Sequence, residues 1–102
     1  RMKFGDLEIF EDARVASVRG EDIPLSPKEF DLLLFMAKNN RVAFDRDHLL
    51  RSVWGFDYYG DERTVDTHVK SLRLRLGDCR KLVSTVWGVG YKFDYKEGGG
   101  NA

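Results

Sequence analysis

The chain opens with short runs in which apolar and polar side chains alternate, a pattern typical of half-buried strands. Leu7 and Ile9 flank a glutamate, and residues 14–18 are rich in small and β-branched side chains. A third run covers residues 23–25, and the acidic and glycine-containing stretches between the runs are typical of turns. We therefore expect a small antiparallel meander with one apolar face before Pro27.

Residues 27–38 repeat apolar side chains at helical spacing. The start of this run favours a helix, because Ser26 can cap it and Glu29 completes a capping box three residues later. Pro27 suits the first helical position, where no amide hydrogen is needed. Two asparagines follow residue 38 and are expected to end the helix.

Two more helices and a hairpin are expected downstream. Asp45 can cap a second helix, whose apolar face precedes a stop signal at Gly55. The helical repeat returns in residues 63–76 and stops at a glycine. Residues 83–86 and 91–93 have strand character and flank the sequence Trp-Gly-Val-Gly, which predicts a β-hairpin.

The order of these elements predicts an α+β fold, a winged helix-turn-helix with an N-terminal antiparallel sheet, three helices and a C-terminal β-hairpin as the wing. At 102 residues the chain suits one domain, which we place at residues 1–96, followed by a flexible tail over residues 97–102. A hydrophobic share of 42% and a charged share of 33% exclude a disordered chain.

The sequence also predicts a cytoplasmic protein without a membrane segment. No apolar run approaches the about 18 residues that a bilayer-spanning helix needs. No leader with a basic and an apolar part follows Arg1, so a secretion signal is not visible. The single cysteine, Cys79, cannot form an internal disulfide and fits a reducing compartment.

Charge is distributed unevenly along the chain, although the formal net charge is zero. Residues 1–62 carry nine basic and 13 acidic side chains, whereas residues 63–92 carry seven basic and two acidic ones. A basic third on a neutral body is the footprint of a surface that meets a polyanion. Charge alone is equally consistent with a solvated helix face.

The third helix has two distinct faces when its residues are placed on a helical wheel. Val65, Val69, Leu72 and Leu76 fall within about 60° of one another and form the buried stripe. The opposite face combines cations for phosphates with small hydroxyl side chains that allow a close approach to base edges, which suits a DNA major groove. This outer face comprises Arg63, Thr67, Lys70, Ser71 and Leu74, with Thr64, His68 and Arg75 on one flank.

The hairpin supplies a second candidate contact with a polyanion. Thr85 can donate a hydrogen bond to a phosphate, and Lys92 is cationic. Gly88 and Gly90 permit a tight tip that can enter a minor groove. Alternatively, the two glycines only serve a turn that needs positive φ.

Catalytic and metal sites are not indicated. Cys79 lies in a polar turn, and no local motif places a base beside it. One cysteine and two well-separated histidines, His48 and His68, give no metal-ligand spacing. The two wing glycines lie between strands rather than before a helix, so they do not form a phosphate-binding loop. We expect no enzyme activity, no cofactor and no metal.

Four motifs extend over most of the chain. From residue 25 it reads L-S-P-K-E-F-D-L-L-L, and from residue 41 R-V-A-F-D-R-D-H-L-L-R-S-V-W-G. The basic helix reads R-T-V-D-T-H-V-K-S-L-R-L-R-L, and the hairpin S-T-V-W-G-V-G-Y-K-F. From about residue 4 to residue 93 the chain resembles the OmpR/PhoB-type winged-helix DNA-binding domain of bacterial two-component response regulators. The resemblance implies sequence-specific binding of double-stranded DNA as the output domain of a phosphorylation-controlled transcriptional regulator, whose N-terminal receiver domain is absent from this chain.

The resemblance also implies how DNA is bound, with helix 63–76 in the major groove and wing 83–93 at the minor groove. Thr67 and Ser71 are similar to base-reading positions, and Ser71 replaces a residue that is often arginine. Trp87 replaces an arginine found in many members, and its indole either packs on sugar or fills the hairpin. The other implied DNA-binding residues, most of them at phosphates or flanks, are Trp54, Arg63, Thr64, His68, Lys70, Arg73, Arg75, Thr85 and Tyr91.

Partners are implied in the same way. Two domains of the family usually sit head-to-tail on directly repeated half-sites, and loop 55–62 occupies the place where family members engage RNA polymerase as activators. The candidate polymerase contacts are Phe56, Asp57, Tyr58, Tyr59, Asp61 and Glu62. A bacterial cytoplasmic location follows from the resemblance.

For several of these side chains a structural role is the alternative. Trp54 can complete the core at the end of an amphipathic helix, and His68 can be an ordinary surface or partly packed histidine. Tyr58 and Tyr59 either form an exposed partner-binding patch or fold back onto the body. A winged helix that binds protein instead of DNA is a further alternative, and Leu74 is the one residue on the outer face that favours it.

Overall fold

The computed structural model describes residues 1–97, and the chain opens with four antiparallel strands paired in sequence order. They are β1 (Met2–Phe4), β2 (Leu7–Phe10), β3 (Val15–Val18) and β4 (Glu21–Ile23). The predicted meander is confirmed, with β1 as an additional strand. The expected strand over residues 23–25 is wrong in its bounds, because Arg19 and Gly20 both have positive φ and form a two-residue turn that pairs Glu21 with Val18.

Helix α1 (Pro27–Lys38) begins and ends as its capping residues predict. The Ser26 side chain accepts a hydrogen bond from the Glu29 amide at 3.2 Å, and the Glu29 side chain accepts one from the Ser26 amide at 2.9 Å. This capping box fixes the Glu29 carboxylate at the start of α1.

The second predicted helix is divided into α2 (Arg46–Leu49) and a π-helical segment, η1 (Leu50–Trp54). Its predicted limits are confirmed: the Asp45 side chain accepts from the His48 amide at 2.7 Å, and Gly55 follows the last turn with a φ of 107°. The wider π-helical turn was not predicted.

Helix α3 (Arg63–Leu76) has the predicted length, and its predicted apolar stripe is buried. It is followed by a 3₁₀ segment, η2 (Gly77–Leu82), that the sequence analysis missed. Cys79 lies on η2 and is buried in the core, so the expectation of a polar turn around it is wrong. The short helix turns the thiol inward while Asp78 and Arg80 remain exposed.

The hairpin consists of β6 (Val83–Val86) and β7 (Gly90–Phe93), and β7 also pairs with β5 (Phe44–Asp45) in the strand order β5-β7-β6. Gly88 has a φ of 83°, as a tight turn requires. Gly90 serves a different purpose, because a Cβ at this position would overlap the Phe44 carbonyl oxygen. The wing is therefore joined to the segment that leads into α2.

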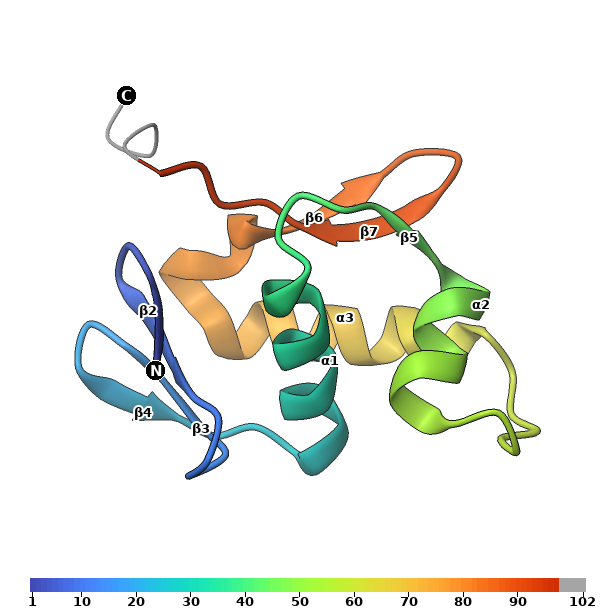
Figure 1. The fold of residues 1–102 in the computed structure, drawn as a ribbon, viewed down its shortest axis with the longest axis horizontal. Coiled ribbons are helices and arrows are strands. Elements are labelled where there is room, and N and C mark those ends of the chain that lie inside the picture. Colours follow the sequence, from blue (N-terminus) through green and yellow to red (C-terminus); the bar gives the residue numbers. More distant parts are fainter. Residues whose placement is uncertain (98–102) are drawn as a thin grey trace.

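The core lies between α1, α3 and the inner faces of the two sheets, with Leu7, Leu33, Leu72 and Phe93 fully buried. In Figure 1, α1 crosses α3, the N-terminal sheet lies at one end, and the loop between η1 and α3 lies at the other. The expected flexible tail falls mostly on residues 98–102, outside the described residues. Within residues 1–97, no helix is both long and apolar enough to cross a bilayer.

Candidate nucleic-acid interface

One stripe of α3 is open to solvent along the whole helix. Arg63, Thr67, Lys70 and Leu74 are exposed, as the helical wheel predicts, and Arg75 is exposed on the flank. Among residues 1–97, Lys70 and Arg75 have no carboxylate within ion-pair distance. Two cations of this stripe are therefore available to an anionic ligand without first leaving a protein partner.

Arg63 is the cation of this stripe that has a partner inside the protein. Its guanidinium Nη2 lies 2.7 Å from Asp61 Oδ2, and its backbone amide donates to the same carboxylate at 2.8 Å. These hydrogen bonds hold the pKa of the Asp61 carboxyl below its ordinary value. Both side chains are well exposed, so an incoming phosphate can compete for Arg63 at little cost.

Ser71 does not face outward, and that expectation is corrected here. Its side chain is half-buried and donates a hydrogen bond to Glu29 Oε2. Burial opposes ionisation of Glu29, but the bonds from Ser71 and the Ser26 amide and the charge of Arg75 together hold the pKa of Glu29 below its ordinary value. The helical wheel places Ser71 at the edge of the outer face. At such an edge the contact with α1 determines the orientation of the side chain.

Arg73 is half-buried and connects α3 to the wing. Its Nε donates to the Val83 carbonyl at 2.8 Å, and its Nη2 donates to Thr85 Oγ1 at 2.8 Å. Its guanidinium also lies 5.6 Å from the centre of the Tyr91 ring. Arg73 and Thr85, both predicted as phosphate contacts, thus bind each other across the interface between helix and wing.

Tyr91 belongs to a second connection between α3 and the wing. Its hydroxyl donates to Asp66 Oδ1 at 2.6 Å, and Arg46 pairs with the other oxygen of that carboxylate at 2.7 Å. Burial and the hydrogen bond to Asp66 raise the pKa of Tyr91 to about 12. Sequence reasoning missed this network, and the only signal was a lone acid, Asp66, in an otherwise basic helix.

The first turns of α3 are held by two rings. Trp54 is half-buried against the core, with its ring centroid 4.9 Å from that of His68 in an edge-on arrangement. His68 Nδ1 lies 2.8 Å from the Thr64 carbonyl oxygen, so this nitrogen carries the proton and donates. Trp54 and His68 therefore have the packing role that was the alternative to DNA contact. Both rings remain only half-buried.

The tip of the wing is apolar and exposed. Trp87 retains 90% of its accessible surface, so its indole does not fill the hairpin, and Val89 beside it is also exposed. The one wing cation predicted from the sequence, Lys92, lies 3.7 Å from Asp94. A contact made by the tip itself would accordingly be apolar rather than ionic.

The loop between η1 and α3 presents exposed aromatic side chains and adjoins the α3 stripe through the Asp61–Arg63 pair. Phe56, Tyr58 and Tyr59 are all exposed, Tyr59 completely, and the ring of Tyr58 also folds over Gly60 within the same loop. Of the two alternatives, an exposed patch therefore fits both tyrosines, with the ring of Tyr58 partly covered. Asp57, Asp61 and Glu62 are exposed in the same loop and give it acidic character.

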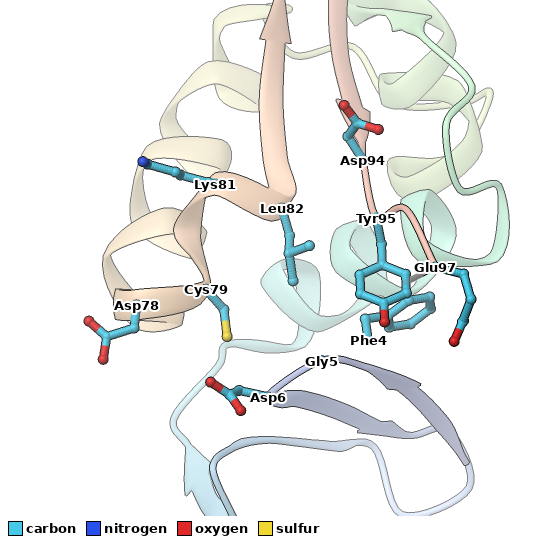
Figure 2. A pocket seen from close by; sticks show the side chains of 10 residues that line it. All are labelled: Phe4, Gly5, Asp6, Asp78, Cys79, Lys81, Leu82, Asp94, Tyr95 and Glu97. Carbon is cyan, nitrogen blue, oxygen red and sulfur yellow. The ribbon is translucent and has the colours of Figure 1, made fainter. Parts of the chain in front are cut away.

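A separate hollow of about 620 Å³ lies between the β1–β2 turn, η2 and the segment after β7. Figure 2 shows Asp6, Asp78, Asp94 and Glu97 around it, with Lys81 as the one cation among its labelled side chains. Burial raises the pKa of Cys79 at its wall. Most of these carboxylates are neutralised by basic partners, which are Arg19, Arg41 and Lys92. The hollow therefore offers no excess of positive charge to a polyanion, and we exclude it from the candidate interface.

Comparison with known proteins agrees with this architecture. A family model described as "Transcriptional regulatory protein, C terminal" matches residues 20–93. The transcriptional regulatory protein SrrA of Staphylococcus aureus is 46% identical over 99 residues. The match covers 93% of this chain and 41% of SrrA, so the chain spans less than half of that relative.

Solved structures show the same fold. The response regulator DrrB of Thermotoga maritima, an OmpR/PhoB homologue, superposes with a TM-score of 0.83 at 35% identity over 91% of this chain and 43% of DrrB. The DNA-binding domain of Klebsiella pneumoniae RstA, solved in complex with the RstA box, has a TM-score of 0.78 at 33% identity over 91% of this chain and 95% of that domain. The predicted winged-helix fold is confirmed.

Proposed function

The chain belongs to the family of C-terminal domains of transcriptional regulatory proteins, and from this premise we propose that it binds double-stranded DNA sequence-specifically to control transcription. The family consists of transcriptional regulators rather than enzymes, in agreement with the non-catalytic prediction. The whole protein is proposed to be a two-component response regulator in the bacterial cytoplasm, in which phosphorylation of a receiver domain controls this output domain.

The observation that carries the proposal is the exposed stripe of α3. A helix can enter a major groove only if one face is polar, cationic and free of obstruction. Within residues 1–97, Lys70 and Arg75 have no ion-pair partner, and Thr67 offers a small hydroxyl between them and Arg63. This hydroxyl donates to the Arg63 carbonyl at 3.1 Å and can still accept a hydrogen bond. The hydroxyl can approach base edges while the flanking cations neutralise phosphates.

We divide the candidate residues into two groups. Direct contacts are proposed for the exposed ones, with Thr67 reading bases, the cations at phosphates and Trp87 on the sugars of the adjacent minor groove. The half-buried residues hold α3 and the wing in the orientation that the exposed ones require. The direct group is Arg63, Thr67, Lys70, Arg75 and Trp87, and the second is Trp54, Thr64, His68, Ser71, Arg73, Thr85 and Tyr91.

Two further partners are proposed from the family resemblance. A second copy is expected to bind head-to-tail on a directly repeated half-site. RNA polymerase is expected to contact loop 55–62, where exposed aromatic and acidic side chains support a protein partner.

The test is fluorescence anisotropy with a labelled random-sequence duplex at several salt concentrations from about 50 to 200 mM. A log–log slope of affinity against salt near −4 to −6 is expected, since each of about five or six neutralised phosphates contributes about 0.9. Lys3→Ala, which removes an exposed lysine from β1, should leave the slope unchanged. No binding at the lowest salt would overturn the proposal and direct attention to a protein partner.

A further inference from the structure

Leu74 is an apolar side chain at the C-terminal end of a polar and cationic stripe. It keeps 75% of its accessible surface and lies one helical turn beyond Lys70 on the same face of α3. Its neighbours on the buried side, Leu72 and Leu76, are both in the core, so packing of the domain does not account for Leu74. The exposed side chain is therefore free to serve a ligand.

An open hollow of about 420 Å³ lies beside Leu74. Its lining consists of Lys70, Arg73, Leu74, Gly77 and Arg80. Gly77 contributes no side chain, and Arg80 is directed back toward it by a hydrogen bond from Nη1 to the Gly77 carbonyl at 3.1 Å. The hollow therefore combines the apolar side chain of Leu74 with three basic side chains in its lining.

This combination fits one feature of a DNA major groove. Thymine carries a 5-methyl group on its major-groove edge, and the other three bases have no methyl group there. A leucine has no donor or acceptor, so it distinguishes bases only through apolar contact with that methyl. The surrounding cations suit the phosphates on either side and disfavour the apolar surface of a protein partner.

We propose that Leu74 is a specificity-determining residue that reads the 5-methyl group of a thymine in the half-site. The inference rests on the proposed function, because it requires α3 to lie in the major groove. Leu74 would be a second base-reading residue, nearer the C-terminal end of α3 than Thr67. The apolar contact of Leu74 and the hydroxyl contact of Thr67 would then read different base pairs.

The experiment replaces single methyl groups in the DNA. A preferred duplex is first selected from a random-sequence library, and each thymine is then exchanged in turn for deoxyuridine, which differs only in lacking the methyl. We expect wild-type affinity to fall about fourfold at the thymine under Leu74, the factor for burial of one methylene-sized group. Leu74→Ala should bind the thymine and uracil forms of that position equally.

Controls separate this effect from other methyl contacts and from misfolding. Thr67 carries a methyl of its own, so a uracil-sensitive position that persists in Leu74→Ala belongs to another residue. Leu74→Met retains a long apolar side chain and should retain the thymine preference, and Val42→Ala, which shortens an exposed valine before β5, should show the wild-type uracil profile. Because Leu74 is exposed, its substitutions should leave thermal unfolding unchanged.

The outcomes distinguish the two proposals. If the wild-type chain selects a duplex but Leu74→Ala has the same uracil profile as wild type, this inference is wrong and DNA binding stands. If no duplex is selected, both are wrong, and Leu74 then favours a protein-binding surface.

Discussion

Tyr91 is assigned to DNA contact by its motif, but in the structure its contacts connect the wing to α3. Its hydroxyl donates to Asp66 on α3, and Arg46 from the start of α2 holds the same carboxylate. The phenol must be protonated to donate, so ionisation of Tyr91 would place two negative groups in contact. Three elements therefore meet at the Asp66 carboxylate.

The pH dependence of this contact follows from the raised pKa of Tyr91. The folded value of about 12 exceeds the ordinary value of 10, so the contribution of Tyr91 to stability is fully present below pH 10 and is lost as pH rises through about 12. In a titration of ultraviolet phenolate absorbance, Tyr91→Phe should remove the last tyrosine step.

Tyr59→Phe is the matched control for this titration. Tyr59 is completely exposed and is not the tyrosine that donates to Asp66, so its loss should leave the last step in place. If Tyr91→Phe also left the last step in place, the hydrogen bond to Asp66 would not hold in solution.

At the scale of elements, hydrogen bonds hold α3 on both flanks, and the exposed stripe between these flanks remains open to solvent. On one flank Ser71 bonds to Glu29 at the start of α1, and on the other Arg73 bonds to the wing. The Glu29 carboxylate thus has two roles: it accepts a hydrogen bond in the capping box of α1, and its bond to Ser71 fixes the rotation of α3 about its axis. An interface built this way presents its cations in one defined orientation.

Ser71→Ala should destabilise the fold rather than change base preference. Loss of a hydrogen bond to a charged, buried group predicts a decrease of about 1–2 kcal/mol in the free energy of unfolding, measured by urea denaturation. The lowered pKa of Glu29 means that this contribution is present above the unfolded-state pKa and is lost as pH falls through the folded-state value. The variant should therefore approach wild type in acid.

Ser52→Ala, an exposed serine on η1, provides the comparison for Ser71→Ala and should change stability by less than about 0.5 kcal/mol. An altered selected DNA motif in Ser71→Ala, with unchanged stability, would contradict the structural role and restore Ser71 as a base reader.

Lys70 and Arg73 should behave differently although both are cations of α3. Lys70→Ala should lower the salt slope of DNA binding by about 1 and leave unfolding unchanged. Arg73→Ala removes the donors to Val83 and Thr85, so we expect a loss of about 1–3 kcal/mol in unfolding free energy and faster amide exchange in β6. Equal effects on the slope, with full stability in both variants, would make Arg73 a free phosphate contact.

The sequence predicted elements whose signals are local and missed contacts between distant segments. The capping box at Ser26 and the stop at Gly55 lie within a few residues of what they control, and both are confirmed. Pairing of β5 with β7 joins residues far apart in the chain, so no local pattern reports it. Ser71 was misplaced for the same reason, because Glu29 on another helix determines its direction.

At the scale of the whole molecule, three surfaces differ in chemistry. The cationic stripe of α3 and the wing tip form one, the hollow beside the N-terminal sheet forms another, and the loop between η1 and α3 forms the third. In Figure 1 this loop and the N-terminal sheet lie at opposite ends of the molecule. The formal net charge of zero conceals these differences. A polyanion is attracted to the cationic stripe of α3, which gives the domain a preferred orientation on DNA.

The exposed aromatic side chains of the loop are not among the proposed DNA contacts, which predicts that transcription activation and DNA affinity can be uncoupled. Tyr59→Ala removes a completely exposed ring that supports no other part of the fold, so affinity for a selected duplex should match wild type. In the whole regulator, transcription from a promoter carrying that site should fall several-fold, because exposed aromatic residues dominate the energy of protein interfaces.

Lys70→Ala supplies the opposite pattern, since a weakened phosphate contact should lower affinity and transcription together. Comparison of the two variants at saturating regulator concentration separates the causes: Lys70→Ala should recover transcription once the site is filled, whereas Tyr59→Ala should not. A parallel fall of DNA affinity in Tyr59→Ala would place the loop on the DNA. Recovery of Tyr59→Ala at saturation would remove RNA polymerase from the partners proposed for this loop.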